Sequence, residues 1–213
     1  MEPKLFYTRK LPHRQPAEET FFVTYRLAGF LPIAVINSLK ENYIQVKNHP
    51  DNQSPERKDV LRQEYFDAFE NELEKNLNEP HWLKDDTIAK IVMDSLLFND
   101  SKKYTLWCAC VMSNHVHILI STFQDSPLLS KLLQDHKKFT AVQSNKTLGR
   151  SGQFWAEESF DTIIRDNNHF LHVVHYIINN PVKAGMAKKW RDWKWTYIHS
   201  DMQEDFLLLP KKT

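Results

Sequence analysis

The sequence is poor in glycine, and its positive and negative charges almost cancel. It holds four glycines among 213 residues, and the only close pair is Gly149 and Gly152. A Walker phosphate-binding loop or a dinucleotide-binding turn needs several glycines at fixed spacings, so both motifs are excluded. The formal net charge is +1. Bulk charge therefore does not indicate a protein that binds nucleic acid.

Cysteines and long apolar runs are also scarce. The two cysteines, Cys108 and Cys110, stand two residues apart in an apolar segment. On a strand they would share one face, where a disulfide between them would be strained. No cysteine spacing is typical of zinc sites, the first residues do not resemble a signal peptide, and no apolar run approaches ~18 residues. We expect a cytoplasmic protein with both thiols reduced.

The charges that are present are unevenly distributed along the chain. Residues 51–79 hold nine acidic side chains and four basic ones, whereas residues 181–195 hold five basic side chains and one acidic one. The C-terminal third could therefore face an anion while the middle of the chain faces water.

Hydrophobic periodicity and turn residues predict four main strands and five helices. The strands are expected over residues 20–27, 104–112, 115–122 and 160–165. Helices are expected from Pro32 to residue 43 and over residues 56–76, 88–98, 128–145 and 168–180. The helix over 56–76 is rich in charge, and Asp86 with Thr87 could cap the one that follows it. We interpret residues 1–19 as an extended arm and residues 201–213 as a tail.

This order of elements predicts an α+β fold in one domain over residues 20–200. If the acidic helix is left out as an insertion, the order is the βαββαβ arrangement of ferredoxin-like folds. We expect an antiparallel sheet with helices on one face and a further helix at the C-terminal end. Many unrelated functions use this fold, so the fold does not define the chemistry.

The sharpest local signal is the pair His115 and His117. Alternate residues of a strand share a face, so both imidazoles would project together while Val116 points the other way. Two neighbouring imidazoles can chelate a divalent cation. Spacing by itself also allows two half-exposed histidines on a sheet, because the His-x-His pattern is common.

The last predicted helix offers a second candidate pair, Tyr176 and Asn180. Residues four apart lie on one helix face, so a phenol would stand one turn from an amide. A tyrosine beside a bound metal could attack phosphorus while the metal stabilises the developing charge. Two other interpretations remain open: Tyr176 as an ordinary amphipathic-helix residue, and Asn180 as the N-cap of a short turn that begins at Pro181 and ends at Gly185.

Several segments resemble one known family, the REP-associated tyrosine transposases of the HUH (IS200-like) superfamily. They follow the same order as in that family, from about residue 20 to residue 195. They are TFFVTYRL (20–27), WCACVMSNHVHILI (107–120), GQFWAEESFDTIIRD (152–166), YIINNPVKAG (176–185) and WKW (193–195). Each motif is modest, but their combination and order are specific.

The resemblance implies a metal-dependent enzyme that nicks and joins single-stranded DNA at hairpins formed by repetitive extragenic palindromes. His115 and His117 would bind Mg²⁺ or Mn²⁺, and Asn180 would complete the metal site. Tyr176 would be the nucleophile and would form a 5′-phosphotyrosine. The sequence departs from the family at two points: Ser113 stands where proline is usual, and Asn180 stands where the wider group often has glutamine.

Contacts with DNA are predicted from basic side chains in the second half of the chain. The candidates for phosphate contacts are Lys137, Lys138, Arg150, Arg165, Lys183, Lys188, Lys189, Arg191 and Lys194. Trp155, Trp193 and Trp195 could stack on unpaired bases, although core packing is the more common role of such residues.

Two other functions compete with the strand transferase. One is a hairpin-binding protein of the same fold that has lost its activity. The other is a small metal-dependent hydrolase, in which Asp161 or Glu157 would join the two histidines and Tyr176 would have no role. The sequence does not distinguish a monomer from a dimer.

Overall fold

The computed structural model describes residues 6–8, 12–14, 18–29, 33–75 and 80–202. Its strands are β1 (Phe6–Thr8), β2 (Pro12–Arg14), β3 (Thr20–Leu27), β4 (Tyr104–Val111), β5 (His115–Thr122), β6 (Trp155–Ile163) and β7 (Thr196–Ile198). Its helices are α1 (Ile33–Asn48), α2 (Pro55–Lys75), α3 (Asp86–Asn99), α4 (Leu129–Thr147) and α5 (Asn167–Lys183), with three short 3-10 turns. None of the described helices is long and apolar enough to cross a membrane.

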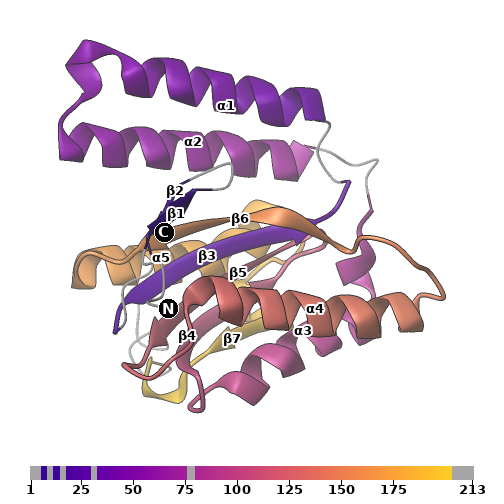
Figure 1. Ribbon diagram of the computed structural model, residues 1–213. Helices are drawn as coiled ribbons and strands as arrows, with labels where there is room; N and C mark the ends of the chain where they lie inside the picture. The colour runs from indigo at the N-terminus through magenta and orange to yellow at the C-terminus, as the bar shows by residue number, and fades with distance from the viewer. Residues whose placement is uncertain (1–5, 9–11, 15–17, 30–32, 76–79, 203–213) are drawn as a thin grey trace.

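The main sheet is antiparallel and has the strand order β6-β3-β5-β4-β7 (Figure 1). Without β7, this is the strand order of a βαββαβ ferredoxin-like sheet, in which the first and third strands are central. The predicted fold class is therefore confirmed. β7 was not predicted, and it extends the sheet beyond β4 with three paired residues.

Helices cover both faces of this sheet and bury two separate cores. α3 and α4 pack on one face, against side chains such as Val23, Val116 and Ile118. α5 packs on the opposite face, against Phe22 and Leu119. The alternation of side chains along β3 and β5 divides their residues between the two cores.

The predicted insertion was the acidic helix alone, but in the structure α1 and α2 form a hairpin that lies as a whole outside the ferredoxin-like arrangement (Figure 1). α2 reaches the sheet through Phe66, which is buried on the same face as α5. The Phe66 ring centroid lies 4.3 Å from that of Phe160 and 5.4 Å from that of Phe22. Aromatic packing thus fixes the charged helix over the α5 side of the sheet.

Local details differ from the predicted boundaries at several places. β6 begins at Trp155, five residues before the predicted start, because its first residues pair with the end of β3. The N-cap of α3 is Asp85, whose carboxylate accepts from the Thr87 backbone N–H, and not Asp86. Part of the predicted N-terminal arm, β1 and β2, forms a two-stranded hairpin. The predicted tail lies outside the described residues from position 203 onwards.

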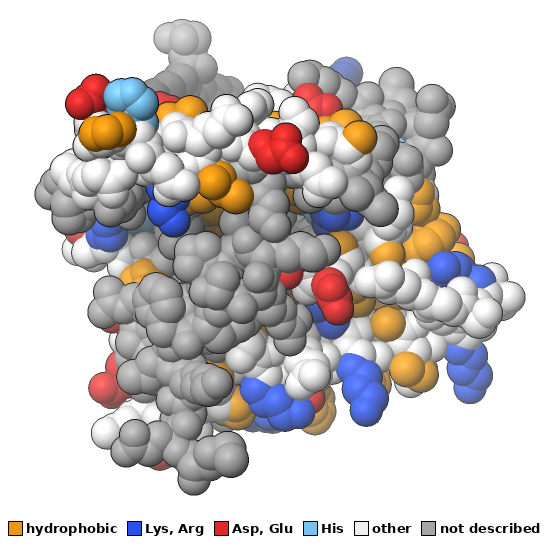
Figure 2. Space-filling view, turned by 45° about the horizontal axis from the view of Figure 1, so that its top comes forward, with side chains coloured by type: hydrophobic (Ala, Val, Ile, Leu, Met, Phe, Trp, Pro, Cys, Tyr) orange, Lys and Arg blue, Asp and Glu red, His pale blue; other side chains and the backbone are white. Residues whose placement is uncertain are grey.

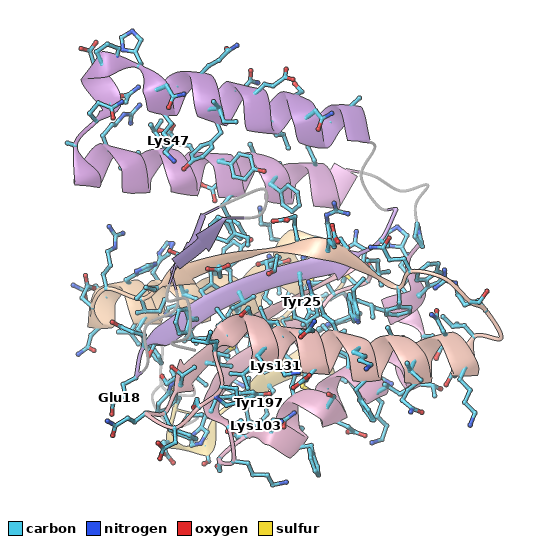
Figure 3. All side chains as sticks on the ribbon, viewed as in Figure 1. Glu18, Tyr25, Lys47, Lys103, Lys131 and Tyr197 are labelled. Carbon is cyan, nitrogen blue, oxygen red and sulfur yellow. The ribbon has the colours of Figure 1, made fainter. Side chains whose placement is uncertain are left out.

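A buried hydrogen-bonded group joins α3, α4 and β3. Tyr25 points from β3 toward α4, and its hydroxyl lies 2.7 Å from Nε2 of His136 (Figure 3). Nδ1 of His136 lies 2.9 Å from the hydroxyl of Ser95 on α3. Burial lowers the pKa of His136 to about 3, so the ring is neutral in the folded protein.

The neutral state of His136 predicts acid-sensitive stability. The folded pKa lies below the ordinary value of about 6.5, so the unfolded chain binds a proton that the folded chain rejects. Stability should therefore fall as pH decreases from about 6.5 toward 3, by up to about 1.4 kcal/mol per pH unit for each such histidine. The free energy of unfolding, measured with urea at several pH values between 6.5 and 4, should depend less steeply on pH in His136→Gln than in the wild type. The same substitution at exposed His172 is the control, and equal slopes for wild type and His136→Gln would contradict the prediction.

Candidate metal and tyrosine site

β5 places two histidines side by side on the face that α5 covers. His115 is 2% exposed and His117 is 0% exposed. Val116, between them, belongs to the core on the opposite face. The predicted shared face is therefore present, but the half-exposed alternative is wrong, since both rings are buried.

The two imidazoles face each other through the same ring atom. Nε2 of His115 lies 2.9 Å from Nε2 of His117. The opposite ring nitrogens have other partners: Nδ1 of His115 lies 2.6 Å from Oδ1 of Asn114, and Nδ1 of His117 lies 2.7 Å from the hydroxyl of Thr24. Such oxygen partners hold metal-binding imidazoles in orientation in many proteins.

Electrostatics keep both rings neutral. Burial lowers the pKa of His115 to about 3, and nearby His81 adds to this effect. Burial also lowers the pKa of His117 well below its usual value, with further contributions from His115 and Lys183 that the Asn180 amide opposes. A neutral imidazole has one lone pair available for a metal ion, so neither ring has to lose a net proton before it can act as a ligand at neutral pH.

α5 brings Tyr176 and Asn180 to the same face of the sheet. The helix begins at its N-cap Asp166 and continues through Pro181 to Lys183. The Asn180 carbonyl accepts from the Ala184 backbone N–H at 2.9 Å, as in an uninterrupted helix. The prediction that the helix stops at Pro181 is wrong, and so is the N-cap alternative for Asn180. The one-turn spacing of Tyr176 and Asn180 is real.

The Tyr176 ring packs directly beside the histidine pair. Its centroid lies 5.4 Å from that of His117, in an edge-on arrangement. It also contacts Phe22 at 5.7 Å and Phe66 of α2 at 5.9 Å. The side chain is half-buried, so the phenol is held by neighbours on β3, β5 and α2 while part of it remains accessible.

Asn180 is a polar side chain in an apolar position. It is 1% exposed, and it lies close enough to His117 to raise the pKa of that ring. Its Oδ1 and Nδ2 make no hydrogen bond of normal geometry with the described residues, and the nearby His117 ring is at best a weak partner. A buried amide without well-placed partners costs about 1–3 kcal/mol, so this side chain is an unfavourable choice for packing alone.

The residues present fit a divalent cation. The donor set is mixed: the amide oxygen, with water or phosphate oxygens, suits Mg²⁺ or Mn²⁺, whereas the two imidazole nitrogens are ligands that softer transition-metal ions prefer. No group of three His, Cys, Asp or Glu side chains within the described part of the chain could hold a metal. A site here therefore depends on Asn180, or on an oxygen from the substrate, as the third ligand.

The carboxylates that a hydrolase would need lie on the other side of the sheet. Asp161 is the register partner of Val23, whose side chain enters the α3–α4 core. Glu157 has the same parity along β6 and therefore shares that face. Neither carboxylate can join the histidine pair, which removes the basis of the hydrolase alternative.

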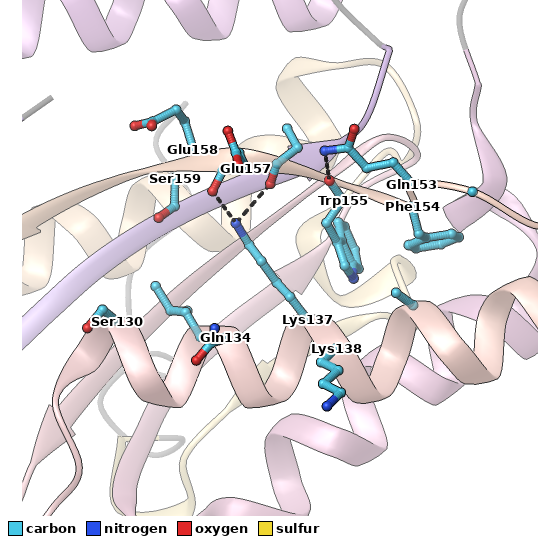
Figure 4. Close-up of a pocket in the computed structure, with 14 residues that line it drawn as sticks. Ser130, Gln134, Lys137, Lys138, Gln153, Phe154, Trp155, Glu157, Glu158 and Ser159 are labelled. Carbon is cyan, nitrogen blue, oxygen red and sulfur yellow. Dashed lines mark hydrogen bonds between the residues drawn. The ribbon is translucent and has the colours of Figure 1, made fainter. Parts of the chain in front are cut away.

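Two of the predicted DNA contacts, Lys137 and Lys138, lie on α4 along a groove of about 330 Å³ beside the edge strand β6 (Figure 4). The Lys137 ammonium lies 3.2 Å from the Ala156 carbonyl and 3.5 Å from the Glu157 carbonyl. It thus covers acceptors of an edge strand that would otherwise face solvent. Lys138 is exposed on the same helix.

Two more predicted contacts are held by the protein itself. The Arg150 guanidinium donates to Asn145 at 2.6 Å and stacks over Trp82 at 3.9 Å. Lys194 donates to the carboxylate of Asp86. A contact with phosphate at either position would compete with these interactions.

The remaining basic residues surround α5. Arg165 precedes the helix and Lys183 ends it, while Lys188, Lys189 and Arg191 lie in the connection to β7, and all are exposed. Figure 2 shows Lys and Arg side chains at separate points of the visible face, with Asp and Glu side chains between them. On the face visible in Figure 2, the positive charge of the described residues is thus dispersed.

The three tryptophans proposed for stacking on bases have structural partners. Trp155 is buried, and its Nε1 donates to Thr140 at 2.9 Å. Trp193 donates to the Val111 carbonyl and Trp195 to Asp86. The core interpretation therefore holds for Trp155, while Trp193 connects the C-terminal segment to β4 and Trp195 connects it to α3.

Comparisons with known proteins find similarity to a single kind of protein. The chain is 23% identical over 105 residues to a protein of Haemophilus influenzae described as a REP-associated tyrosine transposase, and 28% identical over 93 residues to the REP-associated tyrosine transposase of Escherichia coli K12. These matches cover 45% and 43% of this chain, and 60% and 53% of the relatives. The matched segment thus spans little more than half the length of the curated relatives. No protein-family model matches the chain.

A solved structure extends the likeness to nearly the whole chain. It is that of a REP-associated tyrosine transposase bound to a REP hairpin, with a TM-score of 0.56 and 15% sequence identity over 95% of this chain and 89% of the other. The chain resembles the REP-associated tyrosine transposases in both sequence and fold. At this identity, the structural likeness supports the fold and leaves the role of each residue to the local geometry.

The transposase-like motifs identified two histidines, a tyrosine and an amide that the fold brings together, but they did not identify the neighbours that orient them. Thr24 reaches His117 because β3 and β5 pair in a register that places the two residues opposite each other. Phe66 reaches Tyr176 from an inserted helix. Of these neighbours, Asn114 is the one that the sequence could have indicated, because it directly precedes His115.

The buried amide of Asn180 predicts that one substitution will affect folding stability and metal binding in opposite directions. Asn180→Leu should leave the unfolding free energy of the metal-free protein unchanged or raise it by about 1 kcal/mol, because it removes a buried polar group without well-placed partners. The same variant should bind Mn²⁺ more weakly. Unfolding in chelator and Mn²⁺ titration measure the two effects.

The neighbouring Asn179→Leu is the matched control. Asn179 is exposed and donates to the His175 carbonyl on the helix surface, so its substitution should leave Mn²⁺ affinity unchanged. A loss of more than about 2 kcal/mol in Asn180→Leu would show that the amide stabilises the fold, against the range expected for an unsatisfied group.

Proposed function

We propose that the chain is a metal-dependent enzyme that nicks and joins single-stranded DNA beside hairpins. In this proposal His115, His117 and Asn180 hold Mg²⁺ or Mn²⁺, and Tyr176 is the nucleophile. The proposal rests on one observation above all: the Tyr176 ring lies 5.4 Å from the His117 ring, whose Nε2 faces that of His115 at 2.9 Å. All four side chains belong to one chain, so the proposed site needs no residue from a second copy.

The arrangement suits attack by a phenol on phosphorus. The Tyr176 oxygen would form a bond to phosphorus, and the bond between phosphorus and the 3′ oxygen would break. The phenol proton leaves, the departing oxygen takes up a proton, and the products are a 5′-phosphotyrosine and a free 3′-hydroxyl. A bound divalent cation would neutralise charge on the phosphate and favour ionisation of a phenol whose ordinary pKa is about 10.

The proposed substrate class comes from the relatives and from the geometry together. The structural neighbour is bound to a REP hairpin, and both curated relatives carry the name of REP-associated tyrosine transposases. Tyr176 lies on a helix packed across a sheet and is only half-buried, so one phosphate at a time can reach it. A flexible single strand meets this requirement more easily than a stiff duplex.

Tyr176→Phe should abolish covalent attachment to DNA while folding and hairpin binding persist. The substitution removes the hydroxyl and keeps the ring that packs against Phe22, Phe66 and His117. The assay is incubation of the protein with a single-stranded hairpin oligonucleotide and Mn²⁺, followed by denaturing electrophoresis. Attachment should disappear in chelator as well.

Tyr197→Phe is the control, because Tyr197 lies on β7 and packs against the α3–α4 core, away from the histidine pair. An adduct that survives in Tyr176→Phe would disprove the assignment of the nucleophile. Hairpin binding without any adduct in the wild type would instead favour an inactive hairpin-binding protein of the same fold.

The hairpin should be a better substrate than a fully paired duplex of the same sequence. A duplex has a persistence length of about 50 nm and must bend or melt to bring one phosphate to Tyr176. If about three to five cations near α5 contact phosphates, the logarithm of affinity should fall with the logarithm of salt concentration by roughly 0.7 to 0.9 per contact. Binding and cleavage of hairpin, linear and duplex oligonucleotides across a salt series measure both effects. Equal cleavage of duplex and hairpin would contradict the substrate class.

A further inference from the structure

The partners of the two histidine rings determine where each ring carries its proton. Oδ1 of Asn114 lies 2.6 Å from Nδ1 of His115, and a carbonyl oxygen can only accept. His115 therefore has its proton on Nδ1 and a lone pair on Nε2. Asn114 is 3% exposed. Its backbone carbonyl accepts from the Leu27 backbone N–H at 2.8 Å, and this bond holds the turn between β4 and β5 in place.

The contact between the rings then defines the state of His117. Nε2 of His115 and Nε2 of His117 lie 2.9 Å apart, a normal hydrogen-bond distance that requires one proton between them. Because His115 offers a lone pair there, the proton must belong to Nε2 of His117. Nδ1 of His117 is then an acceptor, and the Thr24 hydroxyl donates to it at 2.7 Å.

If both Nε2 atoms were to hold a metal ion, His117 would need the opposite arrangement. Nε2 must lose its proton, and a neutral ring must then carry one on Nδ1. The Thr24 side chain can accept this change, since a hydroxyl both donates and accepts and needs only to rotate. Thr24 is 2% exposed, so water could not easily replace it in either role.

We propose that Asn114 and Thr24 are positioning residues of this site, with unequal tasks. Asn114 holds His115 permanently in the form that presents a lone pair, and Thr24 lets His117 change tautomer when a divalent cation binds. In that change one proton leaves Nε2 and one is taken up at Nδ1, so the ring stays neutral. The inference rests on the proposed metal-binding function, but its first half concerns the metal-free protein.

Nitrogen NMR of the full chain with ¹⁵N-labelled histidine tests the proposal directly. In chelator, His115 should be protonated at Nδ1 and His117 at Nε2, with assignments from His115→Gln and His117→Gln. With saturating Mg²⁺, both rings should be protonated at Nδ1. A His115 ring protonated at Nε2 would overturn the role of Asn114. A His117 ring that has its proton on Nδ1 before Mg²⁺ is added, or that does not change afterwards, would overturn the role of Thr24.

Matched variants separate the hydroxyl from the shape of the side chain. Thr24→Val keeps the volume and removes the hydroxyl, so Mn²⁺ affinity should fall about 10- to 100-fold, as for other outer partners of metal ligands. Thr24→Ser keeps the hydroxyl and should bind Mn²⁺ within about threefold of the wild type, on the same reasoning. Asn114→Leu and Asn114→Asp form the corresponding pair, in which only the aspartate retains an acceptor. Equal Mn²⁺ affinity for Val and Ser at position 24 would overturn the proposal.

These outcomes remain distinct from those of the adduct assay. Absence of any adduct in the wild-type protein would contradict the proposed reaction without changing the tautomers of the metal-free protein. Conversely, an active enzyme with the other tautomer pattern would leave the proposed function intact and remove the positioning roles. Thermal unfolding of each variant shows whether it is folded, and the NMR measurement on the wild-type chain does not depend on any variant.

Discussion

The antiparallel pairing of β3 with β5 is the constraint on which the rest of the site depends. These two central strands place Thr24 opposite His117 and Arg26 opposite His115. A shift of the register by one residue would reverse which side chains face α5 and would move Thr24 away from the imidazole. The same alternation that buries Val23 and Val116 against α3 and α4 therefore directs Thr24 and the two histidines to the other face.

The second constraint is the continuity of α5 across Pro181. Proline lacks the backbone N–H that would donate to the Ile177 carbonyl, so this turn of the helix loses a bond. The adjacent Asn180 buries an amide that makes no hydrogen bond of normal geometry with the described residues. The missing bond and the buried amide thus meet just over one turn after Tyr176, and the amide lies near His117. Local departures from folding rules are expected to gather where a protein uses its residues for function.

What could be predicted from the sequence was local, and what could not be predicted was long-range. The shared face of His115 and His117 follows from strand geometry, and the spacing of Tyr176 and Asn180 follows from helix geometry. The order of the elements was sufficient for the ferredoxin-like fold. The contact of Phe66 with Tyr176 depends on how an inserted hairpin returns to the sheet, and the three residues of β7 carry too little pattern to be recognised. Proline statistics misled the assignment at Asn180, because the packing of α5 against the sheet outweighs the local preference of one residue.

The distribution of positive charge explains how a chain with a net charge of +1 could serve the proposed reaction. Lys137, Arg150 and Lys194 interact with carbonyl, amide or carboxylate groups of the protein, so their charge is partly committed to the fold. Lys183 is different, because its charge reaches His117 and lowers the pKa of that ring. It ends the helix that carries Tyr176, three residues beyond Asn180. In the proposed reaction, a phosphate drawn to Lys183 would therefore arrive near the helix face that carries the phenol, and because Lys183 is exposed this attraction should weaken as salt is added.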